Sequence, residues 1–178
     1  GGWQKERRRM IRPILAILVA AVLLTGCDVP EVEVTGPVYS GPEVTRIIVD
    51  KADRKMYLMH DSRTLKSYDV ELGFTPQGDK VRQGDGRTPE GEYFINRRNN
   101  RSIFHLSLGI NYPNAQDRAE ARALGVSPGG DIFIHGARRK TSPIGPDWTA
   151  GCISVENHEI EEIWKMVSRN GVPVTINP

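Results

Sequence analysis

The feature that most limits the fold of this chain is a series of short apolar runs, four to eight residues long, separated by turn-forming segments. Gly contributes 18 and Pro 12 of the 178 residues. Runs of this length bounded by Gly and Pro are typical of β-strands. The runs that predict strands are residues 44–49, 56–59, 66–73, 91–95, 105–112, 131–135, 152–155 and 172–176. We therefore expect a mainly β (β-rich α+β) domain.

Two segments predict short helices within this β-rich chain. Residues 156–170 carry apolar side chains at the spacing of one helical face, with Gly171 after them. These side chains are Ile160, Ile163, Trp164 and Val167. Residues 115–124 are rich in Ala, and Gly125 suits the position that follows a helix.

The N-terminal residues indicate export. A basic cluster precedes residues 14–24, which contain only Ile, Leu, Val and Ala. Eleven apolar residues are short for a membrane-spanning helix and typical of a secretory signal. The sequence Leu24-Thr25-Gly26-Cys27 resembles the lipobox of bacterial lipoproteins, which implies cleavage before Cys27 and lipid on its thiol. An uncleaved membrane anchor is the alternative, and it also exports the domain.

This interpretation divides the chain into three parts: a signal peptide (residues 1–26), a lipidated Cys27 with a linker rich in Gly and Pro (27–43), and one domain (44–178). After cleavage the chain keeps 19 basic and 21 acidic residues, so it lacks the basic surface of a nucleic-acid-binding protein. Two cysteines exclude a disulfide scaffold and a four-cysteine zinc site.

Cys152 and His135 are the candidate catalytic pair. His135 ends one predicted strand and Cys152 begins another, with residues 136–151 between them. An imidazole close to a thiol can take its proton and so activate it as a nucleophile. Gly151 leaves room for a substrate carbonyl, and the backbone N–H groups of residues 151 and 152 could hold an oxyanion. A paired thiol of this kind is expected to be alkylated rapidly below neutral pH. The alternative is an inert core cysteine and a surface histidine.

The residues around this pair resemble the L,D-transpeptidase catalytic domain (YkuD-like). Its signature is His-Gly, a spacer, and then Ser/Thr-x-Gly-Cys, which matches His135-Gly136 and Thr149-Ala150-Gly151-Cys152. Further blocks look like the murein L,D-transpeptidase branch that includes a peptidoglycan–lipoprotein amidase: residues 84–91, 110–115 and 127–136. The resemblance covers residues 44–177 and implies a β-sandwich or barrel with two short helices.

The resemblance also implies roles for particular residues. Cys152 would attack a peptide carbonyl of a peptidoglycan stem, with His135 as general base. The Gly136 backbone carbonyl would orient the imidazole, and Gly151 would contribute to the oxyanion hole. Trp148, Thr149 and Arg138 are candidate substrate contacts, although Trp148 could equally pack beside the loop, and Asp147 is expected to fix that loop by hydrogen bonds. No metal or organic cofactor is expected. Ala150 and Ser154 depart from the wider family pattern, in which a His often precedes the Gly and an Arg or Asn often follows the Cys-hydrophobic pair, and they match the narrower branch.

The sequence therefore predicts an exported, membrane-anchored lipoprotein that faces the periplasm or cell wall and acts in cell-wall biogenesis and cell shape. Its predicted activity is peptidoglycan L,D-transpeptidation by cysteine acyl transfer. One alternative is a hydrolase of the same family, either an L,D-carboxypeptidase or an amidase that releases a wall-linked lipoprotein. A second alternative is a non-catalytic wall-binding lipoprotein. The expected partners are stem peptides, the membrane and a wall-linked lipoprotein, with no nucleic acid.

Overall fold

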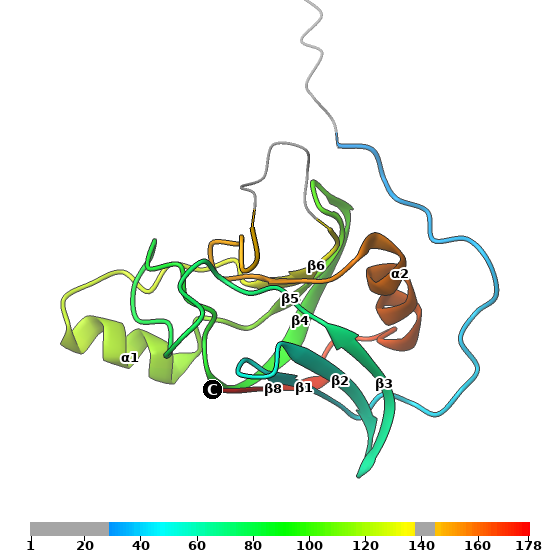
Figure 1. Ribbon diagram of the computed structural model, residues 1–178, viewed down its shortest axis with the longest axis horizontal. Coiled ribbons are helices and arrows are strands. Elements are labelled where there is room, and N and C mark those ends of the chain that lie inside the picture. Colours follow the sequence, from blue (N-terminus) through cyan, green and yellow to red (C-terminus); the bar gives the residue numbers. More distant parts are fainter. Residues whose placement is uncertain (1–28, 138–144) are drawn as a thin grey trace, which may run out of the picture.

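A computed structural model describes residues 29–137 and 145–178 of the chain. In these ranges the chain forms one sheet and two helices (Figure 1). The elements are β1 (Arg46–Asp50), β2 (Lys55–His60), β3 (Arg63–Asp69), β4 (Gly91–Ser102), β5 (His105–Ile110), α1 (Ala115–Ala123), β6 (Phe133–His135), β7 (Ile153–Ser154), α2 (Asn157–Met166) and β8 (Pro173–Asn177). The predicted mainly β fold with two short helices is confirmed.

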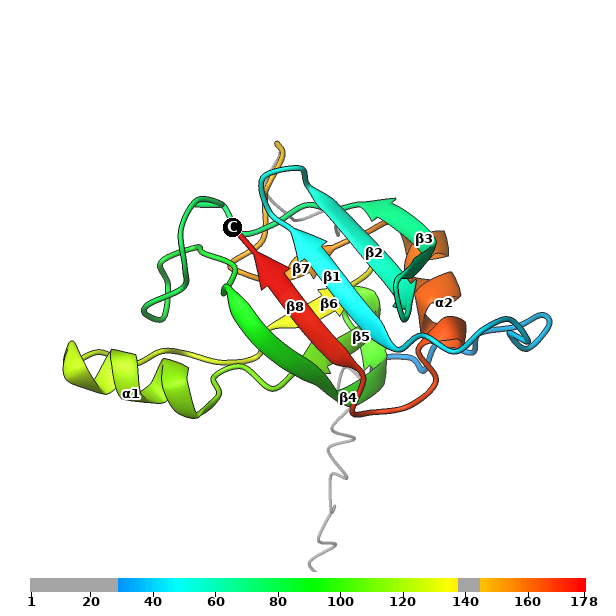
Figure 2. The same ribbon diagram turned by 90° about the horizontal axis from the view of Figure 1, so that it is seen from below.

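The C-terminal strand β8 lies in the middle of the sheet, whose strand order is β3-β2-β1-β8-β4-β5-β6-β7. It pairs parallel with β1 and antiparallel with β4, as Figure 2 shows from below. Strand β1 buries Ile47 and Val49 on one face because side chains alternate along a strand. Arg54, with a φ of 53°, makes the tight turn from β1 to β2.

The two edges of the sheet meet at a β-bridge between Glu71 and Ser154. The Glu71 N–H donates to the Ser154 carbonyl at 2.9 Å, and the Ser154 N–H donates back at 2.8 Å. Glu71 follows β3 and Ser154 lies in β7, so this bridge joins the first and last strands of the sheet order. The bridge closes the sheet in the manner of a barrel and places the segment around Cys152 against residues 71–73.

Helix α2 covers the core through the apolar face that its spacing predicts. Ile160, Ile163 and Met166 are buried, and burying each such side chain contributes about 1.5–3 kcal/mol. The helix ends at Met166, four residues before the predicted end. Arg98 of β4 donates to the Trp164 carbonyl at 3.0 Å and also to the Val167 carbonyl, so a distant side chain satisfies the end of the helix.

Strand β4 is longer than the predicted run of residues 91–95 and continues to Ser102. Its polar second half pairs with β5, so inter-strand hydrogen bonds hold a segment without an apolar pattern. The Arg98 guanidinium also lies 3.7 Å from the centre of the Trp164 ring, a cation–π contact. This ribbon of β4 and β5 rises above the rest of the sheet in Figure 1.

Residues 29–43, expected to be a linker, have no helix or strand but lie against the domain. The Val32 N–H donates to the Asn100 carbonyl at 2.7 Å, and the Lys165 ammonium donates to the Thr35 carbonyl at 2.7 Å. Val32 and Val34 are partly buried against the core. The described part of the predicted linker is therefore docked along the domain.

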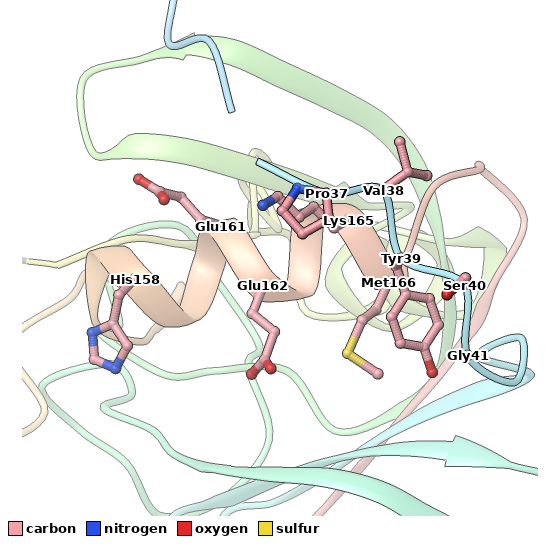
Figure 3. Close-up of a pocket in the computed structure, with 10 residues that line it drawn as sticks. All are labelled: Pro37, Val38, Tyr39, Ser40, Gly41, His158, Glu161, Glu162, Lys165 and Met166. Atoms are coloured by element: carbon pink, nitrogen blue, oxygen red, sulfur yellow. The ribbon is translucent and has the colours of Figure 1, made fainter. Parts of the chain in front are cut away.

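Residues 37–41 form one wall of a pocket of about 550 Å³ whose other wall is α2 (Figure 3). Tyr39 and Met166 lie at one end of the pocket in this view, and His158 lies at the other. Neither His135 nor Cys152 lines it.

No helix in the described ranges is long and apolar enough to cross a membrane. The predicted signal peptide and Cys27 lie outside the described residues.

Candidate active site

Strand pairing brings His135 and the Cys152 segment together. Strands β6 and β7 run parallel, with Ile134 opposite Ile153 and His135 opposite Ser154. Cys152 immediately precedes β7, so the chain leaves the sheet after His135 and returns one strand away. Both side chains line one cavity of about 320 Å³. The spacing in the sequence therefore corresponds to one shared site in the structure.

The tautomer of His135 follows from its backbone partner. The Nδ1 atom lies 2.8 Å from the carbonyl oxygen of Gly136. Because a carbonyl can only accept, Nδ1 carries the proton and Nε2 keeps its lone pair. The ring is 2% exposed, and this burial lowers the pKa of His135 while the bond to Gly136 opposes the shift. The imidazole is therefore held as a neutral base.

Two aromatic rings hold the imidazole in place. Phe104 stacks on His135 with 4.5 Å between ring centroids, and Trp148 meets His135 edge-on at 5.8 Å. Phe104 and Trp148 also contact each other at 5.6 Å. Ring contacts of this kind restrict the imidazole to one orientation and exclude water from its faces.

Gly136 is required by close contacts as well as by its carbonyl. Its oxygen accepts from the Ser154 hydroxyl at 3.1 Å in addition to His135 Nδ1. A Cβ atom at this position would lie 2.7 Å from the Phe104 carbonyl oxygen and 2.6 Å from Asn157 Oδ1. No larger residue fits without displacing backbone.

The surroundings of Cys152 favour its neutral thiol form. Its side chain is partly exposed to the cavity, and Sγ lies 3.5 Å from the Asp131 carbonyl oxygen, to which it donates. The surrounding protein atoms desolvate the charged form and raise the pKa of Cys152, while a backbone hydrogen bond from Phe133 opposes the shift. A raised thiol pKa lowers the fraction of thiolate below neutral pH. It therefore does not favour the rapid alkylation below neutral pH that the sequence predicts.

The turn that carries Cys152 is fixed by Thr149. The buried Thr149 hydroxyl donates to the Cys152 carbonyl at 2.7 Å and accepts from the Gly151 N–H at 3.1 Å. Gly151 has a φ of 133°, and a Cβ there would lie 2.6 Å from the Arg87 carbonyl oxygen. The Gly151 N–H expected in an oxyanion hole already has a partner. Among the described residues, the Cys152 N–H has no hydrogen-bond partner, so this group is free to donate to another acceptor.

The three expected substrate contacts differ in their positions. Trp148 is 9% exposed, packs on His135, and lines a separate pocket that also contains Ser154. Thr149 is buried and acts within the turn. Neither lines the cavity of Cys152. Arg138 lies outside the described residues.

Asp147 anchors the segment that precedes Trp148. Its carboxylate accepts from the Arg54 guanidinium at 2.8 Å and from the Leu72 N–H at 3.0 Å. Asp147 has a φ of 48°, a conformation that Asp tolerates better than most residues. These contacts agree with the expectation that Asp147 fixes the loop.

The loop of residues 73–90 supports the same turn from the other side. The Thr88 hydroxyl accepts from the Gly73 N–H at 3.0 Å, and the Phe74 N–H donates to the Thr149 carbonyl at 2.9 Å. The loop is held in turn by the buried Lys51, whose ammonium donates to the Glu90 carboxylate and to the Gly78 and Thr88 carbonyls. The sequence does not distinguish Lys51, because a lysine after a strand carries no signal of burial.

Phe104, Asp131 and Arg101 line the cavity and were also missed by sequence reasoning. Phe104 and Arg101 belong to the ribbon of β4 and β5, which is remote in sequence from the motif. Asp131 precedes β6 with a φ of 58°, and nothing in the sequence distinguishes its carbonyl as a partner for a thiol.

The fold and this site agree with a comparison against protein families. The family model of the L,D-transpeptidase catalytic domain (YkuD) matches residues 44–176. The chain therefore belongs to the L,D-transpeptidase catalytic domain family, as its motifs predicted.

Similar proteins include YafK of Escherichia coli (strain K12), whose name gives L,D-transpeptidase as a proposed activity. It is 31% identical over 116 residues, which are 64% of this chain and 39% of YafK. The helical cell shape determining protein Pgp2 from Campylobacter jejuni is similar in structure, with a TM-score of 0.60 and 25% identity over 85% of this chain and 51% of Pgp2. Bd1075 from Bdellovibrio bacteriovorus has a TM-score of 0.54 and 26% identity over 75% of this chain and 48% of Bd1075. This chain thus spans about half or less of each relative.

Proposed function

We propose that this chain is a peptidoglycan L,D-transpeptidase that transfers an acyl group through Cys152. The observation that carries the proposal is the arrangement of His135, whose Nδ1 is occupied by Gly136, so that Nε2 keeps its lone pair, and which lines the same cavity as Cys152. Family membership supplies the reaction class, and the shape-determining role in the name of Pgp2 agrees with a substrate in the cell wall.

The first half-reaction acylates the enzyme. Cys152 Sγ attacks a peptide carbonyl of the donor stem while His135 Nε2 takes the thiol proton. A neutral pair suits this order, because the proton moves as the carbon–sulfur bond forms. The backbone N–H of Cys152 can donate to the oxyanion that develops. When the tetrahedral intermediate collapses, the carbon–nitrogen bond breaks, His135 returns the proton to the departing amine, and a thioester remains.

The second half-reaction releases the acyl group to an acceptor. His135 takes a proton from the incoming amine as its nitrogen attacks the thioester carbon. The carbon–sulfur bond then breaks, a new amide forms, and the proton returns to Cys152. Water in place of the amine gives a carboxylic acid by the same steps, which is the hydrolase alternative.

The chain is further proposed to act outside the cytoplasm as a lipoprotein anchored through Cys27. This proposal rests on the lipobox-like residues 24–27 and on the cell-wall substrate implied by the family. Peptidoglycan stem peptides are the proposed partners, and a wall-linked lipoprotein is the partner in the amidase alternative.

Mass spectrometry of digested sacculi tests the activity. Purified sacculi are incubated with the protein, with Cys152→Ala, and with Cys27→Ala, which removes the other cysteine of the chain and serves as the matched control. New cross-linked or amine-exchanged muropeptides with the protein and Cys27→Ala, but not with Cys152→Ala, support the transpeptidase. Trimmed stems or a released lipoprotein remnant would instead establish the hydrolase. Wall binding with no chemical change, equal in all three proteins, would support the non-catalytic alternative.

A further inference from the structure

The lining of the cavity that contains Cys152 includes two formally charged side chains. Among its described lining residues, Arg101 and Asp131 carry the formal charges. Asp131 already pairs with the Arg97 guanidinium at 2.6 Å, outside the set of lining residues. The other lining residues expose mainly apolar atoms, from side chains that include Ile103, Phe104 and Phe133, beside the polar Asn99, Ser102 and Ser107. Among the described residues that line this cavity, Arg101 is therefore the cation, and it shares the cavity with the candidate nucleophile.

Arg101 has a partner that it can readily exchange. Its guanidinium lies 3.2 Å from Glu31 Oε2, with the two side chains 65% and 54% exposed. Ion pairs between exposed side chains contribute about 0–1 kcal/mol, since water competes for both groups. A substrate carboxylate that is presented to Arg101 can therefore replace Glu31, since the existing ion pair is weak.

The position of Arg101 is set by the docked N-terminal segment. Arg101 follows Asn100, whose carbonyl accepts from the Val32 N–H at 2.7 Å and whose side chain donates to Glu31. The Arg101 N–H donates to Asn99 Oδ1 at 2.9 Å. Glu31 and Val32 therefore hold the end of β4 where its arginine lines the cavity.

The proposed reaction brings a carboxylate into the cavity that Arg101 helps to line. A donor peptide that loses its last residue has a free carboxylate on the departing residue. Standard backbone dimensions place the carbon of that carboxylate about 3–4 Å from the attacked carbonyl carbon. The planar guanidinium group matches a carboxylate through two parallel hydrogen bonds.

We propose that Arg101 binds the C-terminal carboxylate of the donor stem peptide and exchanges Glu31 for it. The proposal rests on the function proposed above and makes Arg101 a specificity-determining residue. Glu31 holds the guanidinium in the empty site and competes with the substrate.

Steady-state kinetics with two donor peptides tests this assignment. One donor has a free C-terminal carboxylate and the other a C-terminal amide, and the readout is the ratio of their kcat/KM values. We expect Arg101→Gln to lower this ratio up to about fivefold, mainly through the KM of the free acid, in line with the strength of an ion pair at an exposed guanidinium. Glu31→Gln should lower the KM of the free acid a few-fold. Arg63→Gln, an exposed arginine on β3, is the matched control and should keep the wild-type ratio.

Two results would overturn the proposal. An unchanged ratio in Arg101→Gln would show that the guanidinium does not recognise the terminal carboxylate. A third peptide is amidated on a side-chain carboxylate and free at its C-terminus. If Arg101→Gln no longer changes the kcat/KM of this peptide, the arginine recognises the side-chain carboxylate instead. If the wild-type protein turns over neither donor, that result contradicts the proposed function and not the carboxylate site. Calorimetric binding of both donors to Cys152→Ala, with and without Arg101→Gln, then decides the carboxylate site independently.

Discussion

The Nδ1 atom of His135 donates a hydrogen bond to the carbonyl oxygen of Gly136, its neighbour in the chain, at 2.8 Å. The same oxygen accepts from the Ser154 hydroxyl at 3.1 Å, two residues after Cys152. One backbone carbonyl thus joins the candidate base to the strand of the candidate nucleophile. The orientation of the imidazole depends on this small network and on the rings of Phe104 and Trp148.

The pH dependence of Cys152 reactivity follows from two opposite shifts. Burial raises the pKa of Cys152 and lowers the pKa of His135, so both groups are neutral at pH 7. We expect the alkylation rate with iodoacetamide to keep rising above the ordinary thiol pKa, about 8.5. The ordinary pKa of histidine is about 6.5. Because the pKa of His135 is lowered, the base is protonated only at lower pH, and peptidase or transferase activity should persist below that value.

The alkylation rate at several pH values, measured by intact-protein mass spectrometry, checks this prediction. Cys27→Ala provides the background in which only Cys152 reacts. His135→Ala should slow alkylation at neutral pH because the thiol loses its base. An alkylation midpoint below neutral pH would show instead that the resting pair is a thiolate and an imidazolium.

Ser154→Ala should weaken the positioning of Gly136. The substitution removes a hydrogen bond from a buried hydroxyl and should cost about 1 kcal/mol of unfolding free energy. The Gly136 carbonyl then accepts from His135 alone, which strengthens that bond and raises the pKa of His135. The acidic limb of the activity profile should move to higher pH.

Urea unfolding and a pH–rate profile of Ser154→Ala measure these two effects separately. Ser154→Cys is the matched variant, since it keeps the shape of the side chain with a weaker donor, and its effects should lie between those of serine and alanine. A stability loss with an unmoved acidic limb would assign Ser154 a structural role only.

Asp147→Ala should destabilise the loop that holds Trp148 against His135. The change leaves the Leu72 N–H and the Arg54 guanidinium without their carboxylate, and it places alanine at a φ of 48°. We expect a loss of about 2–4 kcal/mol in unfolding free energy, with a parallel loss of activity. Asp147→Asn keeps an acceptor for Leu72 and tolerates the backbone conformation, so it should cost about 1 kcal/mol. Denaturant titration of both variants is the measurement, and equal stabilities of the two would contradict this account.

Lys51→Met should be among the more destabilising single substitutions in the domain. Lys51 is 2% exposed and lies 2.7 Å from Glu90, so its removal leaves a carboxylate and two backbone carbonyls without their cation. Breaking a buried ion pair in this way costs about 3–5 kcal/mol. A double-mutant cycle with Glu90→Gln, followed by guanidinium denaturation, isolates the pair, and the double variant should recover part of the loss. Additive costs for the two changes would show that Lys51 acts through the carbonyls alone.

The sequence by itself determined most of the fold and the family. The apolar spacing of residues 156–170 predicts α2, and alternation predicts strands such as β1, because both signals depend on neighbours along the chain. The motifs around His135 and Cys152 predicted the L,D-transpeptidase family, which the family comparison confirmed. Their catalytic roles stay predictions.

Only the tertiary structure decided how the site is arranged. Pairing with β5 extends β4 through its polar residues to Arg101, and packing against α2 and β4 docks residues 29–43 on the domain. The Gly151 N–H is occupied by Thr149, and burial raises the pKa of Cys152 and lowers the pKa of His135. Burial, hydrogen-bond partners and pKa values depend on groups that are distant in the sequence and adjacent only in the folded chain, so a local pattern of residues does not contain them.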